Sequence, residues 1–98
     1  MYNDYIPMPV DTSGVELSGE MIRLIDILAR NMHESRAKEY LEAGWRFGDS
    51  MDIVKRTHPD LMPYDELTDI QKERYVSTAS SVVKTMTAIG FKLKNTGT

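Results

Sequence analysis

Apolar residues recur at helical spacing in two long stretches of the chain. The first set consists of Met21, Leu24, Ile25, Leu28, Ala29 and Met32. This spacing places the set on one face and predicts an amphipathic helix. Ser18 is a suitable N-cap and Gly44 a suitable left-handed C-terminal residue, so the predicted helix has about 26 residues.

The second set consists of Tyr75, Ala79, Val82, Val83, Met86 and Ile89. It predicts a second long helix whose inner face packs against the first. Thr68 and Gln71 have the spacing of a capping box, which places the start of this helix at Thr68. Gly90 is placed to end it with a positive φ.

The segment Gly44–Leu67 separates the two helices and is unlike a flexible linker. It contains the single tryptophan, Trp45, together with His58, Pro59 and Pro63. Rigid aromatic and proline residues favour one defined conformation, whereas flexible linkers are rich in glycine and serine. Within it we expect a short helix over residues 49–56, with Met51 and Val54 inward, and one helical turn over residues 65–67.

Both ends of the chain are predicted to be extended. Pro7 and Pro9 keep the preceding residues out of the helical region. We expect the apolar residues of this segment to lie across the helices; they are Tyr5, Ile6, Met8 and Val10. Residues 91–94 alternate apolar and charged, which predicts a short strand able to pair with the N-terminal segment. The predicted fold is mainly α: one domain over residues 1–98 with two long, packed, antiparallel helices.

Composition narrows the classes of function. The chain has no cysteine, which excludes a disulfide framework and thiol catalysis. Its net charge of −3 argues against a nucleic-acid-binding protein. It has no apolar run of membrane-spanning length and no signal-peptide core near the start. We therefore expect a cytoplasmic protein that binds neither nucleic acid nor membrane.

Catalytic and metal-binding motifs are missing from the sequence. His33-Glu34 opens like a zinc-protease motif, but position 37, where the second histidine belongs, is Ala37. Two histidines without cysteine do not make a zinc site. We interpret His33 and Glu34 as polar helix residues with local partners, and we expect no enzyme activity, metal or cofactor.

One group of residues suits ligand binding. Trp45, Phe47 and Tyr64 flank Arg46 in the connecting segment, and Arg36 lies late in the first helix. Aromatic faces stack on planar groups, and guanidinium groups bind phosphate. These five residues are therefore candidates for binding a nucleotide-like, planar, anionic ligand. The alternative is that Trp45 only fills space between the helices, and an intermediate is a ring packed on Tyr64 or Leu67 with one face open.

Five short motifs occur in a characteristic order along residues 5–93. They are Tyr5-x-Pro7-x-Pro9-Val10-Asp11-Thr12-Ser13, Ala29-Arg30-Asn31-Met32-His33-Glu34, Gly44-Trp45-x-Phe47-Gly48, His58-Pro59-x-Leu61-x-Pro63-Tyr64-x-Glu66-Leu67 and Thr85-Met86-x-x-Ile89-Gly90-Phe91. With this series the chain resembles the ryanodine-receptor repeat domain, or RyR domain. The chain departs from the family pattern at Arg36, at Tyr40 and at residues 74–76.

The resemblance implies a non-catalytic module. Similar domains in the receptors form tandem pairs related by an approximate twofold, which implies weak homodimerisation or docking on a partner protein here. One receptor pair is associated with adenine nucleotides stacked by the tryptophan of the Gly-Trp motif. The resemblance thus also implies an alternative, a sensor domain with Trp45 as the stacking residue.

Overall fold

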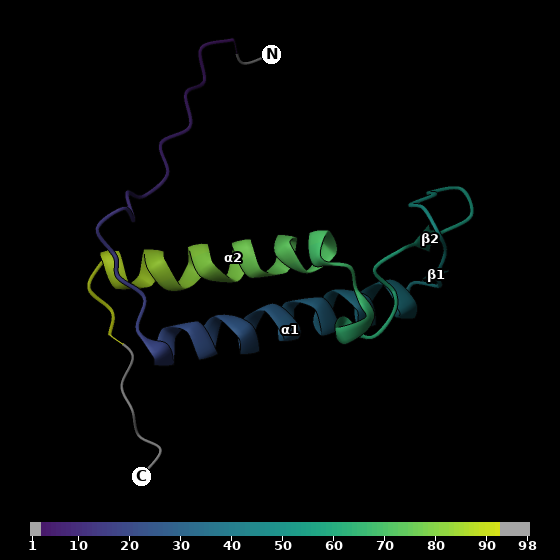
Figure 1. Cartoon of the computed structure of the whole chain (residues 1–98). Helices are drawn as coiled ribbons and strands as arrows, with labels where there is room; N and C mark the ends of the chain where they lie inside the picture. Colours follow the sequence, from purple (N-terminus) through teal and green to yellow (C-terminus); the bar gives the residue numbers. More distant parts are fainter. Residues whose placement is uncertain (1–2, 93–98) are drawn as a thin grey trace.

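Two long antiparallel helices form the body of the protein (Figure 1). The computed structural model describes residues 3–92. Helix α1 spans Gly19–Glu42 and helix α2 spans Asp69–Ala88. Two short strands, β1 (Arg46–Phe47) and β2 (Thr57–His58), and a 3-10 turn, η1 (Tyr64–Glu66), lie between them. The predicted mainly α fold is confirmed.

The caps of both helices match the predictions. The Ser18 hydroxyl accepts a hydrogen bond from Met21 N at 3.2 Å, and Thr68 and Gln71 form both bonds of a capping box. Each helix ends in a Schellman motif around a glycine with positive φ, Gly44 at 91° and Gly90 at 105°. In this motif the amide two residues beyond the C-cap reaches back to the helix. Trp45 N donates to Tyr40 O, and Phe91 N donates to Met86 O, each at 2.9 Å.

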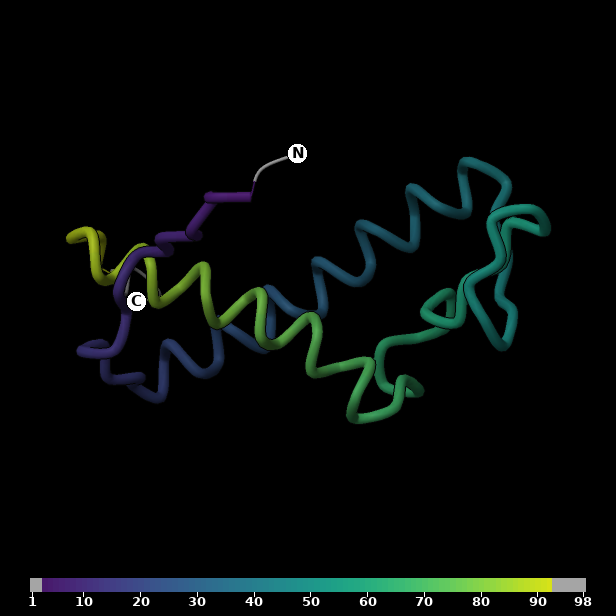
Figure 2. The backbone as a smooth tube through the Cα atoms, turned by 90° about the horizontal axis from the view of Figure 1, so that it is seen from above, coloured from purple at the N-terminus to yellow at the C-terminus, as the bar shows by residue number. Residues whose placement is uncertain are grey.

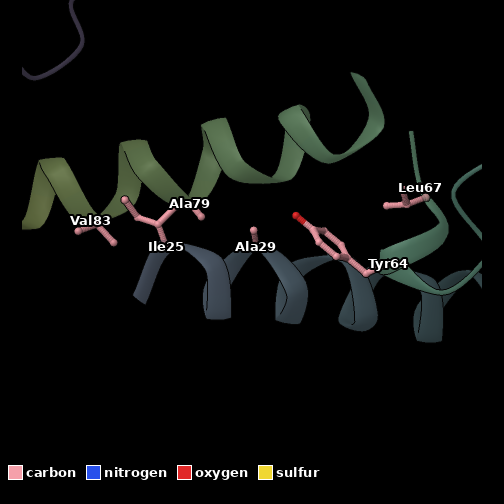
Figure 3. Packing of buried hydrophobic residues seen from close by; sticks show 6 residues of the cluster. All are labelled: Ile25, Ala29, Tyr64, Leu67, Ala79 and Val83. Carbon is pink, nitrogen blue, oxygen red and sulfur yellow. The ribbon is translucent and has the colours of Figure 1, made fainter. Parts of the chain in front are cut away.

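The hydrophobic core is a single row between the helices (Figure 3). Its buried apolar residues are Ile25, Ala29, Tyr64, Leu67, Ala79 and Val83. Four more residues of the first predicted set, Met21, Leu24, Leu28 and Met32, pack against this row. The second set is only partly correct, because Val82, Met86 and Ile89 are exposed while Val76 packs against the core.

The connecting segment differs from the prediction between residues 49 and 56. These residues form no helix: Asp52 and Thr57 pair in an antiparallel bridge around a tight turn. Val54 is 93% exposed and Met51 is also exposed, so neither packs inward. Arg56 has a positive φ of 57°, which turns the chain back so that β2 pairs in parallel with β1. Long-range pairing therefore overrides the local helical pattern.

The first residues of the chain do not cross the helices as predicted. Residues 3–10, here called the N-terminal arm, leave the helix pair where α1 begins and α2 ends and extend away from α2 (Figures 1 and 2). Phe91 and Lys92 form no strand. The rest of the predicted C-terminal strand, residues 93–94, lies outside the described residues. Within residues 3–92, no helix is long and apolar enough to span a membrane.

Candidate functional site

A buried polar network fastens the connecting segment to both helices. His33 of α1 is 1% exposed, and its Nε2 lies 2.8 Å from the carbonyl oxygen of Asp60. Because a carbonyl can only accept, Nε2 carries the hydrogen. The His33 ring also packs edge-on against Tyr64 and Tyr75, with centroids 5.7 and 5.4 Å away. The hydrogen-bond partner of His33 thus lies far along the chain, and of the predicted local partners only Glu34 is near, with its carboxylate 4.0 Å from Nδ1.

The buried carboxylate of Asp60 extends this network to α2. Its two oxygens accept hydrogen bonds from Gln71 Nε2 at 2.8 Å and from the Tyr75 hydroxyl at 2.7 Å. Burial, together with the bond to Asp60, raises the pKa of Tyr75 above its ordinary value. Tyr75 therefore stays protonated and remains a donor at neutral and moderately alkaline pH.

A chain of aromatic contacts leads from this network to Trp45. The Asp60 amide donates to His58 Nδ1 at 3.0 Å, which fixes the imidazole of β2. The Tyr40 ring lies 5.0 Å from His58 and 5.0 Å from Trp45, edge-on to the indole. This last contact is the apolar contact that usually accompanies a Schellman motif. Trp45 is half-buried, and its packing partner is Tyr40, whereas we expected Tyr64 or Leu67.

Two hollows open beside this chain of aromatic contacts. The Trp45 cleft, of about 320 Å³, is lined by Arg36, Glu39, Tyr40, Ala43 and Trp45. A larger central groove, of about 550 Å³, runs between α1, β2 and α2, and its lining includes Arg36, His58, Asp60, Arg74 and Tyr75. Arg36 lines both hollows. Volumes in this range are typical of small-molecule sites.

The structure brings together two of the five candidate ligand-binding residues, Trp45 and Arg36. Arg46 and Phe47 are exposed on β1, where Arg46 pairs with Thr57 and Phe47 with His58. Neither of them lines the Trp45 cleft.

Tyr64 lies apart from the cleft, in the core. It packs against His33 and Tyr75 and carries the Arg30 guanidinium 4.9 Å above its ring. Its aromatic character serves packing between η1 and the helices.

The central groove was not among the sites predicted from the sequence. Its positive groups, Arg36 and Arg74, come from different helices and both act electrostatically on Tyr75. Residues from all three departures from the RyR pattern, Arg36, Tyr40 and Arg74-Tyr75, lie around the central groove or the Trp45 cleft. The departures from the RyR pattern lie together around these two hollows. Because they are separated in the sequence, only the fold shows that they cluster.

A third hollow lies at the opposite end of the helix pair. The open-end groove, of about 370 Å³, is predominantly apolar and lies between the start of α1 and the end of α2. Its apolar lining consists of Met21, Leu24, Leu28, Val83, Met86 and Phe91, with Glu20 and Lys92 among its charged residues. The Schellman motif of α2 places Phe91 beside Met86.

Glycine is needed at two positions of the Gly-Trp motif, for a different structural reason at each. Gly44 holds the positive φ that ends α1. At Gly48, an added Cβ would lie 2.5 Å from Thr57 Cβ, so only glycine fits where the two strands meet.

These roles explain why the motifs occur together. The Gly-Trp motif ends α1 and starts β1, the His-Pro motif fastens the connecting segment through His58 and η1, and the Ile-Gly-Phe motif ends α2. The family model of the RyR domain matches residues 5–95. The chain therefore belongs to the RyR domain family.

Proposed function

We propose that this domain is a non-catalytic interaction module that binds a second copy of itself. The observation that carries the proposal is the open-end groove, an apolar hollow that no other part of the described chain fills. Contiguous exposed apolar surface of this kind marks interaction sites.

The exposed surface of the chain is large for its size. It amounts to 7995 Å², whereas a compact monomer of this mass exposes about 5,700 Å². The radius of gyration is 16.7 Å, compared with about 13 Å for a compact domain of this length. Specific interfaces bury roughly 800 Å² per partner. An interface of that size would cover surface that this extended chain leaves exposed.

A second copy of the chain is a suitable binding partner because the groove is lined by one negative and one positive side chain. Glu20 and Lys92 line the same hollow. In a twofold dimer every contact occurs twice, so both charges can meet opposite charges of the second copy. Apolar lining with paired charges at the edge is the usual arrangement of an interface core and rim.

The test is the mass of the chain in solution over a concentration series, measured by analytical ultracentrifugation. The informative variant is Met86→Glu, which places a charge in the groove. Its control is Ile70→Glu, which makes the same change at an exposed position of α2 outside the groove. We expect the parent and Ile70→Glu to dimerise with rising concentration and Met86→Glu to stay monomeric. A parent that is monomeric at millimolar concentration, or a Met86→Glu variant that dimerises as the parent does, would overturn the proposal.

A second candidate function is sensing of a nucleotide-like ligand. It is supported by the meeting of Trp45 and Arg36 in one cleft, with Arg74 in the adjoining groove. The indole offers a stacking face, and the arginines offer sites for phosphate groups.

Fluorescence tests this candidate directly because Trp45 is the single tryptophan. Titration with an adenine nucleotide should change its emission, and Arg36→Gln should weaken the response. Arg23→Gln, an exposed arginine of α1 outside both hollows, is the matched control. Constant emission up to millimolar nucleotide would eliminate this candidate and leave the interaction module.

A further inference from the structure

The N-terminal arm carries four apolar side chains that are exposed in the described part of the chain. Tyr5, Ile6, Met8 and Val10 are 71%, 78%, 90% and 49% exposed. Ile6, Met8 and Val10 alternate with Pro7 and Pro9 in a segment that forms no helix or strand. Pro7 and Pro9 stiffen the segment between them. The arm is therefore a stiffened segment with exposed apolar side chains.

A turn directs the arm away from the groove of its own molecule. Val15 N donates to Thr12 O at 3.1 Å, and Ser13 N donates to the Asp11 carboxylate at 3.0 Å. Beyond this turn the arm extends outward from the helix pair (Figure 1), and the view from above agrees (Figure 2). In this conformation the apolar side chains of the arm are available to another molecule.

The arm and the open-end groove match in length and chemistry. Along α1 the groove reaches from Met21 to Leu28, about 10 Å at 1.5 Å per residue. Ile6 to Val10 spans about 13 Å at the rise of an extended chain. Three apolar side chains of the arm can therefore lie along the apolar wall of the groove. The groove is lined by side chains of two helices and their ends, with no strand in its lining, so side-chain packing would hold the arm.

We propose that the arm of one copy fills the open-end groove of a second copy. The inference rests on the self-association proposed above and names the segment that produces it. Each copy offers one arm and one groove, so a reciprocal exchange closes at two copies with twofold symmetry. The stiff prolines reduce the conformational freedom that the arm loses on binding.

The first experiment compares two double variants of the full chain by ultracentrifugation. Ile6→Asp with Met8→Asp places charges on the arm, and Ile53→Asp with Val54→Asp places the same charges on the exposed turn at the other end. We expect the arm variant to raise the dimer Kd at least about 100-fold without changing the melting temperature of the monomer. The turn variant should keep the parent Kd. An arm variant with the parent Kd would overturn the inference.

The second experiment locates the arm, and the absence of native cysteine makes it possible. A chain without isotope label carries a nitroxide at Asp4→Cys and is mixed with ¹⁵N-labelled parent chain. We expect the nitroxide to broaden the amide signals of residues 21–28 and 83–91 in the ¹⁵N chain. The same label at Lys55→Cys, in the exposed turn, should leave them sharp.

The outcomes separate this inference from the function on which it rests. Broadening of the groove only when label and isotope are on the same chain would show that the arm folds onto its own groove, and would overturn the exchange. Loss of dimer in Met86→Glu but not in the arm variant would keep self-association and refute the role of the arm. A parent that never dimerises would refute both.

Discussion

The two ends of the helix pair are held together in different ways. At the loop end, residues 43–68 cover the end of α1 and the start of α2, and a buried network joins them through His33 and Asp60. At the open end, where α1 begins and α2 finishes, Met86 and Phe91 are exposed and line the open-end groove.

The difference indicates that the two ends of the helix pair have separate roles. The long-range polar contacts of His33 and Asp60 lie at the loop end, so we expect this network to hold the connecting segment on both helices. The open end keeps apolar surface that contributes little until a partner covers it. We infer that stability is concentrated at one end and binding at the other.

The largest expected effect on stability comes from truncating a buried side chain at the loop end. His33→Ala removes a fully buried ring and its bond to Asp60, and we expect a loss of roughly 2–5 kcal/mol in unfolding free energy. Met86→Ala at the open end should cost about 1 kcal/mol, because its side chain is 47% exposed. Denaturant unfolding at a concentration where the chain is monomeric measures both. Equal losses would contradict the division between the ends.

Removing one hydrogen bond of the network should lower the unfolding free energy by less than His33→Ala does. Tyr75→Phe deletes the donor to the buried Asp60 carboxylate, and we expect a loss of about 1.5–3 kcal/mol. The pKa of Tyr75 is raised in the folded state, so its contribution is complete below the unfolded pKa near 10 and declines as pH rises above it. Between pH 8 and pH 11 the parent should therefore lose more stability than Tyr75→Phe. Parallel losses would show that the hydroxyl does not stabilise the fold.

The close approach of Gly48 to Thr57 of β2 provides a third test. Gly48→Ala places Cβ against Thr57, whose hydroxyl is held by a 2.9 Å bond to Ser50 O, and we expect a cost of about 1–3 kcal/mol. Gly14→Ala is the control, because nothing lies within 4 Å of its added Cβ. Thermal melting of the two variants should separate clearly. Identical melting temperatures would mean that Thr57 moves away from the added Cβ without lowering the stability of the fold.

The smallest effect is expected for the exposed ion pairs of α1. Arg30 lies 2.8 Å from Asp65 and 3.1 Å from Asp26, but all three side chains are solvent-exposed. Arg30→Gln should cost less than about 1 kcal/mol, and salt should reduce the difference from the parent. A large, salt-independent loss would instead point to the contact with the Tyr64 ring.

Local signals in the sequence predicted the helices well. Ser18, Thr68 with Gln71, Gly44 and Gly90 act within one turn of their own position, so their roles are readable from neighbours alone. The stripe from Met21 to Met32 is likewise a property of one helix.

The missed features depend on partners distant in sequence. His33 bonds to a residue 27 positions away, so its burial has no local signal. Residues 49–56 have helical spacing, but the Asp52–Thr57 bridge and the β1–β2 pairing decide their shape. Tyr64 looks like a ligand-binding aromatic in the sequence, whereas η1 turns it into the core. The exposure of Met86 and of the N-terminal arm also depends on what the fold leaves uncovered.

The most direct test of this division is an amide NMR spectrum of the parent chain recorded over a concentration series. If the open end binds a second copy, shifts should change in residues 21–28, in residues 83–91 and in the N-terminal arm. The signals of His33, Trp45, Asp60 and Tyr75 should stay in place. Shifts concentrated at the loop end, or none at any concentration, would contradict the assignment of binding to the open end.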